Sequence, residues 1–159
     1  MSTQFIIREL KKEDIPAAVK LLRPMWDEHA DRTKLLDTQY IKNYDIAAYC
    51  ERSLKDPNQQ MFVADAKGRL IGVARVEIQG NLPGMYGVDK MAYFDDLAVD
   101  PEYRRKGVAS RLIKIREKYA KDRGVSVCYS KVYKFNTGAQ KLMENAGFED
   151  KYRHYYKFI

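Results

Sequence analysis

The sequence has 159 residues, of which 45% are hydrophobic and 32% are charged, a composition typical of a globular protein with one domain over residues 1–159. We find no apolar run long enough to cross a bilayer and no secretory signal at the N-terminus, so we expect a cytoplasmic protein. The two cysteines, Cys50 and Cys128, lie within apolar patterns and predict buried thiols. Neither they nor His29 and His154 have a partner at ligand spacing, so no metal site is expected.

The positive charge of the chain is concentrated in one segment. The formal net charge is +7, and residues 101–124 hold nine Lys or Arg against three acidic residues, a local excess of 9 − 3 = +6. Such a concentration predicts an anionic partner near this segment: nucleic acid, an acidic membrane surface or a phosphorylated small molecule.

The first part of the chain predicts a strand and two helices. Residues 5–9 form a short apolar run typical of a strand. Residues 11–30 carry apolar side chains at helical spacing, and we expect Pro24 to end or kink this helix. Residues 37–54 have the same spacing and predict a second helix.

The middle of the chain predicts three strands. The runs 60–65 and 70–79 are separated by Lys67 and Gly68, which is typical of a β-hairpin. A third strand is predicted over residues 91–99.

The last part predicts a βαβ unit followed by a short helix. A helix over 104–123 and a strand over 125–133 follow the strand 91–99, and this unit should be parallel and right-handed. A helix is expected from Asn136, as N-cap, to Gly147. Residues 148–159 predict one or two closing strands.

The basic turn that precedes the helix 104–123 has the features of an anion site. The first amides of a helix lack internal partners, and the helix dipole adds positive charge there. Gly107 allows close approach of the backbone to an oxyanion, and Arg104, Arg105 and Lys106 add charge. The alternative is a solvated basic face on an amphipathic helix. The pattern matches neither the ATP-hydrolase nor the Rossmann phosphate loop.

Two motifs resemble those of the GCN5-related N-acetyltransferase (GNAT) superfamily. The segment "DDLAVDPEYRRKGVASRLI" resembles the strand and acyl-CoA loop of that family, and "NTGAQKLMENAGF" resembles its second signature. The resemblance implies an acetyl-CoA-dependent N-acetyltransferase of the α/β (α+β) class. It also implies a mixed, mostly antiparallel sheet of six or seven strands, with a central parallel βαβ unit and about four helices.

The resemblance also implies where acetyl-CoA would bind. The diphosphate would lie on the amides of residues 105–110, the pantetheine arm would pair with the strand 91–99, and the helix after Asn136 would flank the arm. The implied cofactor-binding residues are Leu97, Ala98, Val99, Arg104, Arg105, Lys106, Gly107, Val108, Ala109, Ser110, Asn136, Ala139 and Lys141.

Acetyl transfer to an amine needs a base and a donor for the thioester oxygen. Strand alternation places Asp95 with Leu97 and Val99, and Asp96 on the opposite face with Ala98. By resemblance to polyamine-acetylating members Asp95 is the expected base, acting through a water, with Glu77 as second candidate. The backbone N–H near Leu97 is the expected oxyanion donor. A salt bridge or solvent exposure would be the structural alternative for either acid.

One position departs from the family pattern. Met143 aligns with the usual tyrosine, the presumed acid for the leaving thiolate, and a thioether cannot donate a proton. Tyr93, Tyr133 or Tyr155 could replace it, or the thiolate could leave unassisted. A non-catalytic acyl-CoA-binding or sensor domain is the alternative that this departure keeps open.

The expected acceptor is a small cationic amine, polyamine-like or aminoglycoside-like. Trp26 and Asp27, with Glu28 and Asp31 nearby, could attract such an amine through charge and cation–π contact. An exposed helix end is the structural alternative for this cluster. A protein N-terminus or lysine remains a possible acceptor, and the sequence leaves a homodimer open. A nucleic-acid or membrane partner is not expected, since no recognition motif or apolar anchor accompanies the basic segment.

Overall fold

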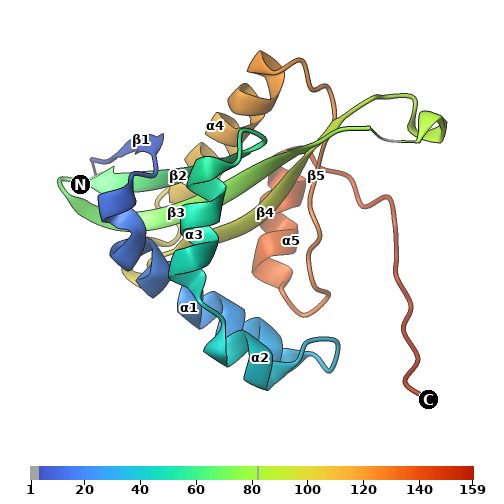
Figure 1. Cartoon of the computed structure of the whole chain (residues 1–159), viewed down its shortest axis with the longest axis horizontal. Coiled ribbons are helices and arrows are strands. Elements are labelled where there is room, and N and C mark those ends of the chain that lie inside the picture. Colours follow the sequence, from blue (N-terminus) through green and yellow to red (C-terminus); the bar gives the residue numbers. More distant parts are fainter. Residues whose placement is uncertain (1–3, 82) are drawn as a thin grey trace.

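The computed structural model describes residues 4–81 and 83–159, in which five strands form one sheet in the order β1-β2-β3-β4-β5 (Figure 1). The first four strands are antiparallel to their neighbours, and β5 runs parallel to β4. This arrangement confirms the predicted hairpin and the predicted parallel βαβ unit. The strands are β1 (Ile6–Glu9), β2 (Gln59–Ala66), β3 (Arg69–Gln79), β4 (Met91–Val99) and β5 (Cys128–Tyr129).

Helices cover both faces of the sheet. Figure 1 shows α1 and α3 on one side of the strands and α4 on the other, and the side chains of α5 pack in the same core as those of α4. The helices are α1 (Ile15–Arg32), α2 (Thr38–Asn43), α3 (Ile46–Lys55), α4 (Val108–Asp122) and α5 (Thr137–Asn145), with short 3₁₀ turns at Lys12–Asp14, Gly84–Tyr86 and Pro101–Tyr103.

Alternation along the strands builds a core on each face. On β3, Val73 belongs to the core under α1 and α3, whereas Ala74 and Val76 belong to the core under α4. Leu22 and Leu112 are fully buried in these two cores, one on each side. The sheet is therefore covered on both faces, and access to its backbone is left at the strand edges.

The N-terminal helices differ from expectation at two places. Of the two outcomes expected at Pro24, an end or a kink, the helix does not end there: α1 continues through it, with Leu22 and Ala30 on either side of the proline both buried so that their packing offsets the local cost. The single helix expected over 37–54 is two helices. The carboxylate of Asp45 accepts a hydrogen bond from the Ala48 amide and begins α3 there.

The C-terminal part of the sheet is smaller than expected. The strand predicted over 125–133 pairs with β4 at two residues only, and residues 149–159 form no strand. The described chain thus has five strands where six or seven were expected, and five α-helices where about four were expected. No helix within residues 4–81 and 83–159 combines the length and apolarity needed to cross a membrane.

Candidate active site

The basic turn before α4 presents exposed backbone. Gly107 has φ of 81° and is the N-cap of α4, where no side chain caps the helix. The first backbone bond of the helix runs from the Arg111 amide to the Gly107 carbonyl, so the amides of residues 108–110 precede the helical ladder. A Cβ at Gly107 would meet no atom within 4 Å. The approach to these amides is therefore open, which fits an anionic group.

The cations of this turn are also exposed. Arg105 adopts a left-handed φ of 59°, and Lys106 lies with its Nζ 5.0 Å from the centre of the Tyr103 ring. Within the described residues neither has an acidic partner, whereas nearby Arg69 is bound to Asp100 and Glu102. The side chain of Arg104 donates from Nε to the Val99 carbonyl. Exposed cations beside open helix N-terminal amides are the features of an anion-binding site.

Strands β4 and β5 separate next to this turn. They pair only at Ala92 with Cys128 and at Tyr93 with Tyr129. The Ser130 hydroxyl donates to the Phe94 carbonyl at 2.7 Å, and from there to Val99 the described chain places no strand on the β5 side of β4, while β3 continues on the other side. The edge of β4 at Leu97–Val99 therefore faces no strand on this side, and the Val99 carbonyl there accepts from the Arg104 side chain.

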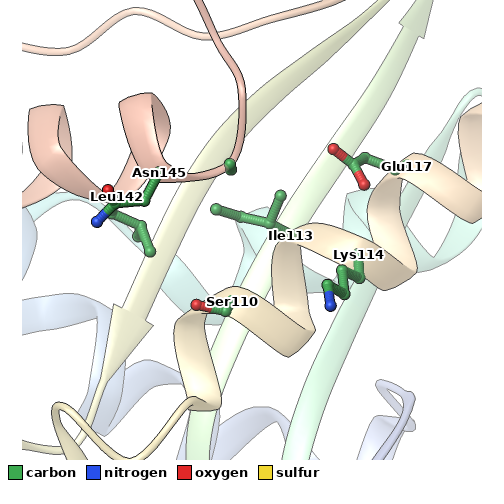
Figure 2. A pocket seen from close by; sticks show the side chains of 7 residues that line it. Ser110, Ile113, Lys114, Glu117, Leu142 and Asn145 are labelled. Carbon is green, nitrogen blue, oxygen red and sulfur yellow. The ribbon is translucent and has the colours of Figure 1, made fainter.

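A cleft lies between α4 and α5 beside the same turn. Figure 2 shows Ser110, Ile113 and Lys114 of α4 on one side and Leu142 and Asn145 of α5 on the other. Asn136 begins α5, and its side chain accepts from the Ala139 amide, which confirms the predicted N-cap. Ser110 belongs both to the cleft and to the basic turn. Lys141 is exposed on α5, and Ala139 is half-buried.

A β-bulge in β4 changes the expected faces of the two aspartates. Ala74 pairs with Leu97 and Val76 pairs with Phe94, so Arg75 alone lies opposite both Asp95 and Asp96. Phe94 and Leu97 both pack toward α4, and both aspartates lie on the α1/α3 face. The expectation that Asp95 shares a face with Leu97 was therefore wrong, because the extra residue interrupts strict alternation.

Arg75 binds both carboxylates that the sequence singled out as bases. Its Nη1–H donates to Asp95 at 2.7 Å and its Nη2–H donates to Glu77 at 2.7 Å. The guanidinium is buried against the Tyr49 ring, while the Asp95 and Glu77 side chains stay 31% and 28% exposed. Both acids are held in place and are reachable by a ligand.

Asp96 forms the inner part of this acidic site. Its carboxylate accepts from the Trp26 indole at 2.8 Å and from the Tyr49 hydroxyl at 2.6 Å. Burial, followed by the charge of Asp95, raises the pKa of Asp96 to about 6. Burial and the charge of Asp96 raise the pKa of Tyr49, which keeps that phenol protonated as a donor. The Trp26 ring thus lies against Asp96, next to Asp95 in the sequence.

Arg116 supports the bulge from the other face. This residue of α4 is fully buried, its Nη1–H donates to the Arg75 carbonyl at 3.1 Å, and its guanidinium lies 4.4 Å from the centre of the Phe94 ring. Its Nη2 has no hydrogen-bond partner in the described residues. A cation therefore lies behind the strand segment that carries Asp95 and Asp96.

The acidic run at the end of α1 does not form one cluster. The carboxylate of Asp27 lies 3.6 Å from Arg23, Glu28 pairs with Arg32, and Asp31 pairs with Lys42. Glu28 is turned about 100° from Asp27, whereas Asp27 and Asp31 lie four residues apart on one side of the helix and face the cations Arg23 and Lys42. Asp27 is not joined to the Trp26–Asp96 contact.

The three tyrosines named as possible acids lie in different places. Tyr93 stacks on Tyr129 at 4.9 Å, and Tyr133 is half-buried and stacks on Phe135 at 5.2 Å. Tyr155 is exposed on the C-terminal segment. Burial raises the pKa of Tyr133, so its hydroxyl keeps its proton at neutral pH.

Sequence reasoning missed the centre of the acidic site. The bulge in β4 turns Asp96 inward and places Arg75 opposite both aspartates, and α3 contributes Tyr49. Strand alternation alone does not predict a bulge. A signal was present, since an arginine within the apolar strand "LIGVARVEI" requires a buried partner. Within residues 4–81 and 83–159, no three His, Cys, Asp or Glu side chains come together as a metal site.

Comparison with known proteins is consistent with this geometry. A sequence model described as the acetyltransferase (GNAT) family matches residues 16–148. An aminoglycoside N(6')-acetyltransferase type 1 of Salmonella enteritidis is 26% identical over 147 residues, covering 92% of this chain and 93% of that protein. The aminoglycoside N-acetyltransferase AAC(6')-Iy in complex with CoA superposes with a TM-score of 0.79 at 22% identity, covering 100% of this chain and 97% of that one. The structure of AAC(6')-Iy with the bisubstrate analogue CoA-S-monomethyl-acetylneamine superposes with a TM-score of 0.78 at 23% sequence identity, with 98% of each chain covered.

Proposed function

Since the chain belongs to the acetyltransferase (GNAT) family and is an acetyl-CoA-dependent N-acetyltransferase, we propose that its acceptor is a small polycationic amine of the aminoglycoside kind. The observation that carries this proposal is the group of carboxylates at the β4 bulge. Asp95 and Glu77 are partly exposed beside Asp96 and the ring of Trp26, and this combination attracts a cation in a chain that is otherwise basic.

Acetyl-CoA fits the open side of β4. Residues 105–110 would bind the diphosphate, the edge at Leu97–Val99 would bind the pantetheine arm, and Asn136 with the following helix would flank it. The bound thioester supplies an activated acetyl group. The acids lie on the opposite face of β4 from the side chain of Leu97, so the acceptor and the carrier approach the strand from different sides.

Asp95 is proposed as the base. An ordinary amine has a pKa near 10 and must lose its proton before its nitrogen can form the new C–N bond. Asp95 accepts this proton, through a water, while Arg75 fixes the carboxylate and Glu77 attracts the acceptor. The backbone N–H near Leu97, next to the bulge, donates to the thioester oxygen as negative charge develops.

The C–S bond then breaks and the thiolate needs a proton. Among the three candidate tyrosines we favour Tyr133, because it is half-buried just beyond the point where β5 leaves β4. Tyr93 is stacked on Tyr129 before that point, and Tyr155 is exposed away from it. Met143 packs in the core beside α4 and takes no part.

An acceptor panel tests the proposal. Release of free CoA from acetyl-CoA would be measured with aminoglycosides, with spermidine and with peptides that carry a free N-terminus or a lysine. We expect aminoglycosides to give the highest kcat/KM. A preference for peptides would overturn the acceptor assignment. Tight binding of acetyl-CoA with no thiol release for any amine would favour the sensor alternative.

A further inference from the structure

Arg116 of α4 is a fully buried cation that forms no ion pair with any carboxylate in the described residues. Its Nε–H donates to the Leu112 carbonyl at 3.3 Å and its Nη1–H donates to the Arg75 carbonyl at 3.1 Å. Its Nη2 has no partner within residues 4–81 and 83–159. Burial of a charge without a counter-ion is costly, and a leucine or a methionine would fill the same space without that cost. Packing alone therefore does not explain an arginine at this position.

The contacts of Arg116 reach both strands of the β4 bulge. Its hydrogen bond ends on Arg75, the residue of β3 that lies opposite both Asp95 and Asp96. Its guanidinium lies 4.4 Å from the centre of the ring of Phe94, the residue before Asp95. The side chain of Arg75 meanwhile binds Asp95 from the opposite face of the sheet. The Arg116 guanidinium is thus fixed behind the carboxylates by groups of both strands.

The charges at the bulge show why a second cation matters. Asp95, Asp96 and Glu77 bring three carboxylates together, and Arg75 is the one cation bonded to them. With Arg116 counted, the group has one net negative formal charge, and without it the group has two. Like charges at close range disfavour the ionised forms, so a carboxylate takes up a proton more readily when the second cation is missing.

The charges of the two aspartates act on Arg116 across the strands. Burial lowers the pKa of Arg116 to about 9, while the charges of Asp95 and Asp96, followed by those of Cys128 and Glu117, raise it. An arginine with this pKa keeps its proton at neutral pH. Because Coulombic attraction is mutual, Arg116 in turn favours the ionised forms of Asp95 and Asp96.

The other groups around the aspartates do not supply this charge. Burial, followed by the charges of the acids, raises the pKa of Tyr49 and of Tyr93, so both phenols stay neutral. Burial likewise raises the pKa of Cys50 and keeps that thiol neutral. The titratable or charged groups that act on the two aspartates or are acted on by them are Tyr49 and Cys50 of α3, Arg75 and Glu77 of β3, Tyr93 of β4, Tyr129 of β5 and Arg116 of α4.

We propose that Arg116 is a positioning residue for acetyl transfer: it fixes the β4 bulge, and its charge keeps Asp95 ionised and ready to accept the proton of the amine. The inference rests on the proposed role of Asp95 as the base. Since Arg116 is fully buried, it acts through the strands and through its charge. The lack of a carboxylate partner suits this role, because an ion pair of its own would cancel the charge that acts on the aspartates.

Substitution of Arg116 by methionine tests the role of the charge. Methionine keeps an unbranched side chain and removes the charge. The pH dependence of kcat/KM would be measured with the best amine of the acceptor panel, since its acid limb reports the protonation of the base in the free enzyme. We expect this limb to lie about one pH unit higher in Arg116→Met, with kcat/KM about tenfold lower at pH values below it. A side chain that only packs would change the stability and leave the limb in place.

Arg111→Met is the matched control on the same helix. Arg111 also donates to a backbone carbonyl, that of Phe5 at 3.0 Å, and its guanidinium lies 4.2 Å from the centre of the Phe5 ring. This variant loses the same kinds of contact away from the acidic site, so its acid limb should coincide with that of wild type. An equal displacement in both variants would overturn the proposal.

A titration of the wild-type chain needs neither a variant nor an acceptor. The ¹⁵Nε resonance of Arg116 and the ¹³C-labelled aspartate carboxyls would be followed by NMR from pH 4 to 8. We expect the Arg116 resonance to shift with a midpoint near pH 6, together with the Asp96 carboxyl, and the Arg111 resonance to stay constant. A constant Arg116 resonance, or an Arg116→Met limb at the wild-type pH, would contradict the inference. Failure of the proposed function would appear instead as no CoA release with any amine, whereas the NMR titration contains no amine.

Discussion

Replacing Gly107 by valine tests the proposed diphosphate site. The φ of 81° at this residue disfavours any side chain, and a β-branched one most of all, at a cost of about 1–3 kcal/mol. A Cβ would meet no protein atom within 4 Å, so the cost is confined to the backbone and the fold should persist. The valine would occupy the space where the diphosphate approaches the amides.

The expected loss of CoA affinity is large. A hydrogen bond to a charged group contributes about 1.5–3 kcal/mol, so loss of two such amide bonds amounts to about 3–6 kcal/mol. Since each 1.4 kcal/mol is about tenfold in Kd, CoA should bind about 10²–10⁴-fold more weakly. Titration calorimetry with CoA measures the affinity, and thermal unfolding measures the stability.

Gly124 provides a matched control at the other end of α4. It also has a left-handed φ, 69°, and a Cβ there would meet only the Lys90 Nζ at an ordinary 3.7 Å. Gly124→Val should lose similar stability and keep its affinity for CoA, because α4 separates it from the turn by about 22 Å. Unchanged CoA affinity in Gly107→Val, or an equal loss in both variants, would refute the reasoning.

Three further predictions concern the acidic face and the leaving thiolate. Asp95→Asn should lower kcat/KM by about 10²–10⁴-fold and alter its pH profile; an unchanged profile would remove Asp95 from the mechanism. Because the pKa of Asp96 is raised to about 6, the folded state keeps a proton between pH 4 and 6 that the unfolded chain has lost. Wild type should therefore lose up to about 3 kcal/mol of stability as the pH rises through this window, and denaturant titrations of Asp96→Asn should lack that loss. Tyr133→Phe should lower kcat with little change in CoA affinity, and an unchanged kcat would mean that the thiolate leaves unassisted or that Tyr93 protonates it.

The parts of the fold that follow local rules could be predicted from the sequence. Hydrophobic alternation and turn residues located β2, β3 and β4, and the Asn136 cap located α5. The division of the helix expected over 37–54 was missed, because its apolar spacing continues across Tyr44 and Asp45, where the backbone is extended and the Asp45 cap begins a new helix.

The positions of site residues could be predicted where a sequence motif fixes the backbone conformation. They could not be predicted where tertiary contacts shift the strand register. The turn at Gly107 lies where the motif places it, since its left-handed φ is a conformation that glycine adopts freely and that residues with a Cβ disfavour. Which face of the sheet Asp95 and Asp96 occupy depends on one extra residue of β4 opposite Arg75. No local pattern in the β4 sequence predicts this extra residue. The partners of Asp96 come from α1 and α3, at a distance of 70 and 47 residues along the chain.

The attachment of Arg116 to β3 has a consequence for the choice of acyl donor. Ser110 at the proposed diphosphate turn and Arg116 behind the bulge belong to one helix, six residues or about 9 Å apart. This helix therefore sets the distance between the proposed phosphate contacts and the carboxylates. A thioester on a carrier with a shorter or longer arm would hold its carbonyl carbon too far from the amine. We therefore expect the enzyme to discriminate among acyl donors by the length of the arm that joins the thioester to the diphosphate.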